Sequence, residues 1–514
     1  MVPARPPPPS PVPLYPIGYA RLISEFSLEV MPLHRVTYVA PSAQRRERVE
    51  SGREVVVLPA SRHRGGDGLV DHLEFALKHE GVNLEVLAAL FRGVDEARIE
   101  GELGAAVRDR PTGRYTRILW FLYEWITGRV LAVPDAATGN YVPVLDPEAY
   151  FAAKGRKSRR HHVLDNLLGT RDYSPVVRRT PELRRFQSMD LAGEAASLVR
   201  QFDEDALRRA VSSLYTKETR ASFDIEGEHP STGRTERFVS LLRALPGMAS
   251  IDRARLIDIQ NQTVDPRFAD RDYRLEQVYV GEQIDMTRQQ IHYVAPRPED
   301  VAPMMEGWRA LLEAMRESGI DPVVSAAVAS FGFVFIHPFS DGNGRIHRAL
   351  VHYVLSVNGF SPQGVIFPVS AVMLARRNEY DACLESFSVP LLERVDYDES
   401  EDGTIAVRND TAGFYRYFDA TLMAEALYRW VEETVRKEFR HELEVVVAMR
   451  DVREGLRRIV DLPDRQANLF IRLVAQNRGQ LSAARRRKHF SALTDEEVRR
   501  MEQVVRERLA AVAG

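Results

Sequence analysis

The chain has 514 residues, 44% of them hydrophobic and 28% charged, with 70 basic against 73 acidic side chains and a net charge of −3. This length predicts about three domains, and the composition favours a packed chain over a disordered one. The balanced charge argues against a dedicated nucleic-acid coat. Cys383 is the single cysteine, which excludes an intrachain disulfide or a multi-cysteine zinc site and favours a reducing, cytoplasmic compartment.

The N-terminal third combines short strands with helices. Residues 1–34 begin with a proline tract and are expected to be flexible, without the pattern of a signal peptide. A separate small α+β domain is expected at 35–178, and its sequence reveals no chemistry. Its apolar spacing predicts strands at 36–39 and 55–58 and helices within 69–93 and 114–127, followed by a basic, solvated or partner-facing loop at 154–162.

Helices dominate from residue 179 onward, so the predicted fold class is mainly α. The apolar spacing predicts helices at 183–202, 204–225, 234–245, 299–318, 322–335, 343–358 and 410–450, and a small helical tail at 461–514. Residues 276–280 and 290–294 alternate in polarity, which predicts a β-hairpin with a turn at Gly281 and Glu282. No run of about 20 apolar residues occurs, so we expect no membrane span.

One segment carries recognisable chemistry: His337-Pro338-Phe339-Ser340-Asp341-Gly342-Asn343-Gly344-Arg345-Ile346-His347-Arg348. Proline prevents a helix from continuing past His337, and glycines before the next helix let backbone N–H groups approach an anion. Arg345 and Arg348 are three residues apart on one helix face and suit phosphate oxygens. Asp341 offers an oxygen ligand for Mg²⁺, and His337 suits a general base. These residues predict a nucleotide-phosphate site with a histidine base.

This segment resembles, at every defined position, the HPFxDGNGRxxR signature of the Fic family, whose members characteristically transfer AMP from ATP to a hydroxyl of a protein side chain. The resemblance covers about 185–450. It implies a helical region at 179–250, a Fic-type catalytic core at 251–395 and a long-helix Fic-associated segment at 396–460. The hairpin at 277–294 stands where the family has its flap, a strand edge that holds the target protein by backbone pairing.

The resemblance also implies roles for individual residues. His337 would deprotonate the incoming hydroxyl, and Asp341 would hold Mg²⁺ against the phosphates of the substrate ATP. The implied catalytic residues are His337, Asn343 (steadying the α-phosphate) and Arg345. The implied nucleotide-binding residues are Phe339 (which also anchors the loop in the core), Asp341, Gly342, Asn343, Gly344, Arg345, Arg348 and Tyr380 (bordering the adenine pocket).

A second motif lies far upstream of the signature. Ser222-Phe223-Asp224-Ile225-Glu226-Gly227 is similar to the inhibitory pattern [S/T]xxxE[G/N] of the family. The resemblance implies that Ser222, Glu226 and Gly227 belong to an inhibitory helix end and that Glu226 pairs with Arg348. A guanidinium that points at Glu226 cannot also hold the γ-phosphate. We therefore expect a self-restrained protein adenylyltransferase.

Two alternatives stay open from the sequence. Relatives with this glutamate can also remove AMP, so the chain could be a deAMPylase or a bifunctional switch. It could instead be a regulatory module whose flanks bind DNA or protein, which the basic cluster Arg485 to Lys488 supports. The tail lacks a clear helix-turn-helix glycine and wing, so DNA binding is the weaker expectation. A homodimer through the core is compatible with the family, but no residue requires it.

Overall fold

The computed structural model describes residues 14–41, 44–50, 52–60, 66–248, 250–284, 289–400 and 403–510, with side chains to 508. The chain forms two compact units, each assembled from three stretches. Unit 1 comprises Met1–Arg185, Ser250–His347 and Asp381–Glu425, and unit 2 comprises Phe186–Ala249, Arg348–Tyr380 and Ala426–Gly514. Within the described residues, no helix is both long and apolar enough to cross a membrane.

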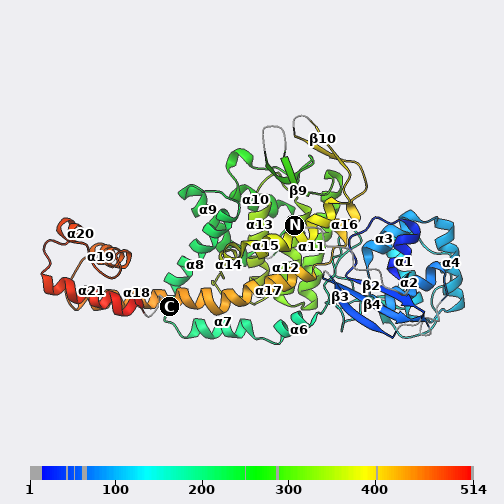
Figure 1. Ribbon diagram of the computed structural model, residues 1–514, viewed down its shortest axis with the longest axis horizontal. Helices are drawn as coiled ribbons and strands as arrows, with labels where there is room; N and C mark the ends of the chain where they lie inside the picture. Colours follow the sequence, from blue (N-terminus) through cyan, green and yellow to red (C-terminus); the bar gives the residue numbers. More distant parts are fainter. Residues whose placement is uncertain are drawn as a thin grey trace. The chain divides into compact units, whose positions relative to one another are not determined.

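Unit 1 begins with the expected α+β domain, whose strands β2, β3 and β4 lie beside blue helices in Figure 1. A four-stranded sheet has the order β1-β2-β4-β3, in which β2 and β4 are parallel and the other pairs antiparallel. Its strands are β1 (Tyr15–Ile17), β2 (Arg35–Ala40), β3 (Arg46–Glu50) and β4 (Arg53–Pro59). The helices are α1 (Tyr19–Phe26), α2 (Leu69–His79), α3 (Leu84–Gly93), α4 (Glu96–Asp109) and α5 (Arg114–Thr127). A second sheet has the order β5-β7-β6 and consists of β5 (Val142–Pro143), β6 (Arg156–Ser158) and β7 (Val163–Asp165).

The expectation of a flexible segment at 1–34 is wrong for its second half. Residues 1–13 lie outside the described residues, but β1 pairs with β2 from Tyr15 onward, and Leu22 of α1 is fully buried. The apolar residues after the proline tract therefore belong to the core of the N-terminal domain. The expected loop at 154–162 contains β6, and its Arg160 pairs with Glu124 and Asp135.

The second part of unit 1 is the expected helical core with its hairpin. α12 is apolar on all sides and almost wholly buried, as a central core helix must be. The elements are α10 (Arg253–Thr263), η3 (Pro266–Phe268), β8 (Tyr279–Gln283), β9 (Gln289–Val294), α11 (Pro298–Ser318), α12 (Pro322–Ile336), β10 (Tyr397–Glu399), β11 (Ile405–Val407) and α16 (Ala412–Arg416).

The hairpin turn is not at Gly281 and Glu282, which both lie within β8. The register shifts between Val280 and Gly281, and a Cβ on Gly281 would meet the carbonyl oxygen of Gln290 at 2.6 Å. The glycine thus accommodates a close cross-strand approach at a β-bulge. The sequence pattern predicts a turn at this position. Residues 285–288, between the strands, lie outside the described residues.

Unit 2 is helical. Its elements are α7 (Leu191–Arg200), α8 (Glu204–Ile225), α9 (Thr232–Ala244), η2 (Leu245–Gly247), α14 (Val369–Ala375), the π-helical turn η4 (Thr434–Phe439), α18 (Arg440–Arg457), α19 (Asp464–Gln476), α20 (Ala483–His489) and α21 (Asp495–Ala510). Four helices contribute residues to both units: α6 (Pro181–Gln187), α13 (Asn343–Val357), α15 (Arg377–Leu392) and α17 (Thr421–Glu433). The C-terminal helices share a core of their own around Phe470 and Met501.

The long helix expected at 410–450 begins later than predicted. It starts at Thr421 and continues through α17, η4 and α18 to Arg457. Residues 412–416 form the separate short helix α16. Residues 418–420 interrupt the helical pattern because their backbone pairs with Val176, which donates to the carbonyl of Phe418 and accepts from the N–H of Ala420. A tertiary contact therefore overrides the local helical pattern.

Candidate active site

The predicted histidine base lies at the C-terminal end of α12. His337 adopts a left-handed conformation (φ 52°), after which Pro338 prevents helix continuation. Its Nδ1 lies 3.0 Å from the carbonyl oxygen of Val334. A carbonyl can only accept, so this contact requires a proton on Nδ1 and leaves the lone pair of the neutral imidazole on Nε2. The geometry therefore selects the tautomer that a general base needs.

The catalytic loop, residues 337–342, is closed by Asn343 at the start of α13. The Asn343 side chain accepts from the backbone N–H of Phe339 (3.1 Å) and donates to its carbonyl (2.8 Å). Gly342 has φ 88°, and a Cβ there would meet Val264 at 2.9 Å, so only glycine fits without a shift. The loop therefore delivers the backbone N–H groups of residues 342–344 to the N-terminal end of a helix.

Asp341 and Arg345 contact each other. The guanidinium of Arg345 lies 2.9 Å from Oδ1 of Asp341 and also donates to the carbonyl of Thr263 at 3.3 Å. The Asp341 side chain is 48% exposed, whereas Arg345 is buried. The carboxylate is thus accessible, and the arginine is held in place by protein groups.

A segment that the sequence did not single out supports this loop. Asp270 accepts from the backbone N–H of Ser340 (2.9 Å), and the buried Gln260 donates to the carbonyl of Asp341 (3.3 Å). Arg274 donates to the carbonyls of His337 and Pro338. The sequence pattern assigns no role to residues 260–275. No local pattern distinguishes Arg274 among 64 arginines, because its role depends on distant carbonyls.

Arg348, in unit 2, contacts the residues of the upstream motif. Its guanidinium lies 2.7 Å from Oε1 of Glu226 and donates to Oγ (2.9 Å) and the carbonyl (2.7 Å) of Ser222. Burial acts to lower the pKa of Arg348, but the Glu226 carboxylate and the Tyr380 hydroxyl outweigh it and hold that pKa above its ordinary value. Arg348 is 1% exposed and the Glu226 side chain 35% exposed. The two residues, 122 positions apart, form the expected ion pair.

The end of α8 has a defined geometry. Glu226 is the C-cap, and Gly227 follows with φ 68°, in the left-handed region that favours glycine. Arg377 donates to the carbonyl of Ile225 at 2.7 Å and satisfies one of the last helix carbonyls. These contacts fix the backbone on both sides of the Glu226 side chain.

Helix α8 is also anchored two turns earlier by a buried polar cluster. Glu218 lies 2.7 Å from Nε2 of His352 and accepts from the backbone N–H (2.8 Å) and the hydroxyl of Ser370. His352 is on α13, the helix that carries Arg348, and Ser370 is on α14. This network holds α8 against the helix whose arginine Glu226 contacts.

Two residues that were expected to bind the nucleotide are buried among aromatic side chains. Phe339 is fully buried, and its ring packs 5.7 Å from that of Tyr273, so its side chain anchors the loop in the core. The ring of Tyr380 lies 5.8 Å from that of Trp430, and the residue borders Arg348. The variable His347 packs on Phe331.

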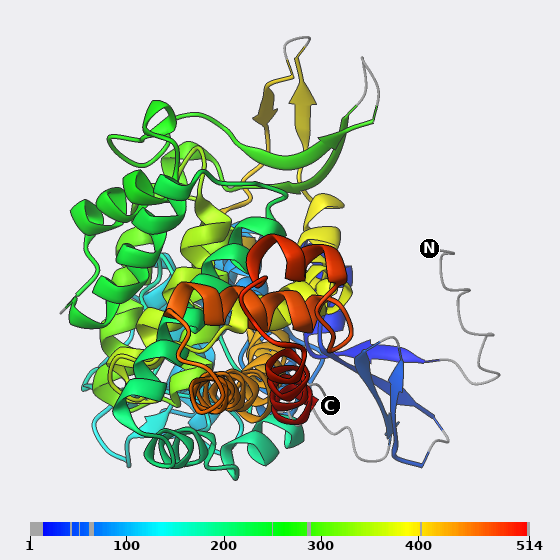
Figure 2. The same cartoon turned by 90° about the vertical axis from the view of Figure 1, so that its left-hand side faces the viewer.

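The base of the flap, strands β8 and β9, is attached to the same core. The Tyr293 hydroxyl donates to the carbonyl of Phe335, two residues before His337, and the Tyr415 hydroxyl donates to that of Val294 at 2.6 Å. Figure 2 shows the β10 and β11 hairpin beside the flap, where Gln289 and Glu399 are 2.6 Å apart. Hydrogen bonds therefore attach the base of the flap to the helical core.

The described residues contain no group of three or more His, Cys, Asp or Glu side chains arranged to hold a metal ion. This excludes an all-protein cage among them, but it fits Mg²⁺, which proteins usually bind through one or two carboxylates together with substrate phosphates. Asp341 is the exposed carboxylate beside the helix N-terminus and is the residue that could do this.

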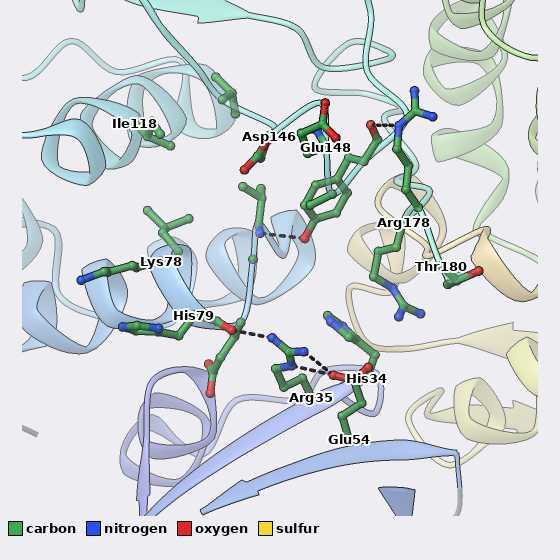
Figure 3. A pocket seen from close by; sticks show the side chains of 18 of the residues that line it. His34, Arg35, Glu54, Lys78, His79, Ile118, Asp146, Glu148, Arg178 and Thr180 are labelled. Atoms are coloured by element: carbon green, nitrogen blue, oxygen red, sulfur yellow. Dashed lines mark hydrogen bonds and ion pairs between the residues drawn. The ribbon is translucent and has the colours of Figure 1, made fainter. Parts of the chain in front are cut away.

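A separate cavity of about 460 Å³ lies in the N-terminal part of unit 1. Figure 3 shows Arg35 in its wall, where it donates to the carbonyl of His79 and pairs with Glu54 at 2.5 Å. Side chains of both signs line it, including Arg178 and Asp146. This mixed lining selects no single ligand charge.

Comparisons with known proteins match the part of the chain that contains the catalytic loop. Residues 250–355 match the family model described as Fic/DOC family. "Protein adenylyltransferase Fic" of Drosophila yakuba is 30% identical over 266 residues, which cover 46% of this chain and 49% of that protein. The protein of the same name from Drosophila persimilis is 27% identical over 228 residues, which cover 39% of this chain and 42% of that protein. The chain thus spans about half the length of the curated relatives it matches.

Solved structures of Fic proteins also match at low similarity. A Fic family protein from Desulfovibrio desulfuricans has a TM-score of 0.35 and 17% identity, covering 66% of this chain and 86% of that one. Fic-1 from C. elegans has a TM-score of 0.30 and 17% identity, covering 73% and 95%. The match at residues 250–355 includes the whole segment from His337 to Arg348, so this part of the chain is similar to the Fic/DOC family.

Proposed function

We propose that this chain is a protein adenylyltransferase that transfers AMP from ATP to a Ser, Thr or Tyr hydroxyl of a target protein or of itself. The observation that carries the proposal is the complete loop from His337 to Arg348, in which Nδ1 of His337 is tied to Val334 so that Nε2 can accept a proton. The matching Drosophila relatives are named for the same activity.

The reaction is a displacement at phosphorus. The target oxygen attacks the α-phosphorus of ATP, its proton passes to Nε2 of His337, and the bond to the bridging oxygen breaks to release pyrophosphate. Charge on the phosphoryl oxygens would be stabilised by the backbone N–H groups of residues 342–344 and by Arg345 and Arg348. Asn343 would steady the α-phosphate by shaping the loop, since its amide is bonded to Phe339.

Asp341 would hold Mg²⁺ together with phosphate oxygens, and the ion would supply charge neutralisation on the phosphates. The contact between Asp341 and Arg345 must then loosen, because both side chains acquire nucleotide-bound partners. The flap would hold the target segment by backbone pairing along a strand edge.

The pair of Glu226 and Arg348 supports autoinhibition as part of the proposal. The Arg348 guanidinium donates to Oγ and the carbonyl of Ser222 and to the Glu226 carboxylate, so these donors must be released before they can hold a γ-phosphate. The wild type is therefore expected to be a weak enzyme.

The position of the radioactive phosphate in ATP tests the reaction class. Label from α-³²P-ATP with Mg²⁺ should appear on protein with Glu226→Gly and disappear with Glu226→Gly/His337→Ala. Label from γ-³²P-ATP instead would show phosphate transfer and refute the proposal. No transfer from any nucleotide, combined with release of AMP from an AMP-modified protein, would indicate deAMPylation.

A further inference from the structure

Arg274 is a buried arginine that binds backbone carbonyls on every side. It is 4% exposed, and its guanidinium donates to the carbonyls of His337 (2.8 Å), Glu276 (2.8 Å) and Pro296 (2.6 Å). Its backbone N–H donates to the carbonyl of Pro338 at 2.9 Å. All four bonds lie within unit 1.

The acceptors belong to two functional elements. His337 and Pro338 begin the catalytic loop, whereas Glu276 precedes β8 and Pro296 follows β9. One guanidinium therefore connects both ends of the flap to the carbonyl of the histidine itself. The three carbonyls are bonded by three different nitrogens of the planar guanidinium, Nε, Nη1 and Nη2. A lysine ammonium carries its three donors on a single nitrogen and cannot match this spacing.

The charge on the Arg274 side chain makes it costly to separate the segments that this side chain connects. Burial lowers the pKa of Arg274 to about 10, so the guanidinium remains charged at neutral pH. The described residues place no carboxylate in ion-pair contact with it, and backbone carbonyl dipoles supply its solvation. A buried cation is costly when its hydrogen-bonding partners are lost, so moving either element away from Arg274 is unfavourable.

We propose that Arg274 is a positioning residue that fixes the flap relative to His337 and thereby places the target hydroxyl within reach of Nε2. This inference rests on the proposed function. The base must lie about 2.6–3.2 Å from the hydroxyl oxygen, and a displacement of about 1 Å can cost roughly 100-fold in rate. The loss should fall on transfer to the hydroxyl and spare nucleotide binding, because Arg274 bonds His337 and Pro338 and not residues 341–348, which are proposed to bind the nucleotide.

The test uses Glu226→Gly as parent and adds Arg274→Met or Arg274→Lys. Transfer from α-³²P-ATP to the chain itself and to lysate proteins gives kcat, and titration with a fluorescent ATP analogue gives Kd. Arg117→Met is the matched control, because Arg117 is also 4% exposed and its guanidinium donates to the backbone carbonyls of Asn140 and His162.

We expect both Arg274 variants to lose about 10- to 100-fold in kcat with Kd changed less than about threefold, and the control to retain the kcat and Kd of the parent. If Arg274→Met does not fold, Arg274→Lys with hydrogen exchange at 289–296 and 337–345 decides. Transfer within threefold of the parent, or equal losses in kcat and affinity, would overturn the inference. An inactive parent would instead refute the proposed function, and the inference with it.

Discussion

Replacing Glu226 by glycine removes the charged partner of Arg348 and should activate the enzyme. The guanidinium keeps two acceptors on Ser222, a neutral hydroxyl at 2.9 Å and a carbonyl at 2.7 Å. Only the Glu226 contact, at 2.7 Å, pairs charges. Its loss lowers the cost of turning Arg348 toward the nucleotide.

The size of the effect follows from the contact and its exposure. A hydrogen bond to a charged group contributes about 1.5–3 kcal/mol, which corresponds to roughly 10- to 100-fold. Because the Glu226 side chain is 35% exposed, solvent weakens the pair and favours the lower end of this range. Glu226→Gln keeps a hydrogen bond from the Arg348 guanidinium but loses the pairing of opposite charges, so its activity should be intermediate.

Initial rates of label transfer from α-³²P-ATP at several ATP concentrations measure the effect. Asp224→Gly is the matched control, since it also removes one exposed carboxylate and adds one glycine at the end of α8, whereas the guanidinium of Arg348 contacts Glu226. We expect Glu226→Gly to exceed the wild type at least about tenfold. Equal rates would refute the competition, and equal activation by Asp224→Gly would show that loosening of the helix is the cause.

Further predictions concern the catalytic loop, the inhibitory contact of Arg348 with Ser222 and Glu226, and the N-terminal domain. In the Glu226→Gly background, Asp341→Ala should reduce transfer at least about 100-fold and abolish its response to Mg²⁺ titration, because the carboxylate beside the phosphates is lost. Asn343→Ala should lower the melting temperature and the rate together, since two buried hydrogen bonds to the loop, about 1 kcal/mol each, disappear. Ser222→Ala should raise wild-type transfer only about two- to fivefold, since one neutral bond to Arg348 is lost. Burial raises the pKa of Glu85 from 4.5 to about 8, so its protonated form favours folding at low pH, and that stability is lost as the pH rises from about 4.5 through about 8. The melting temperature of Glu85→Gln should therefore vary less between pH 5 and 9 than that of the wild type. The variant Glu29→Gln, at an exposed position, should follow the wild type.

The catalytic loop could be predicted closely because its geometry is encoded locally. Proline after His337 ends α12, and glycine at 342 permits φ 88° immediately before α13. The helix boundaries at 204–225 and 322–336 likewise follow apolar spacing and capping aspartates. The predicted turn of the flap is wrong, since Gly281 lies at a bulge. Bulges and turns both favour glycine, so the sequence alone does not distinguish them.

The helical periodicity and the loop from His337 to Arg348 could be predicted from the sequence alone, because they depend on residues within a few turns of each other. Which distant groups complete the site depends on the tertiary packing. Only packing brings Glu226 to Arg348 and the carbonyls of His337 and Pro296 to Arg274. Such contacts join residues that are 22 to 122 positions apart, and their hydrogen bonds depend on ångström-scale placement that no local pattern specifies.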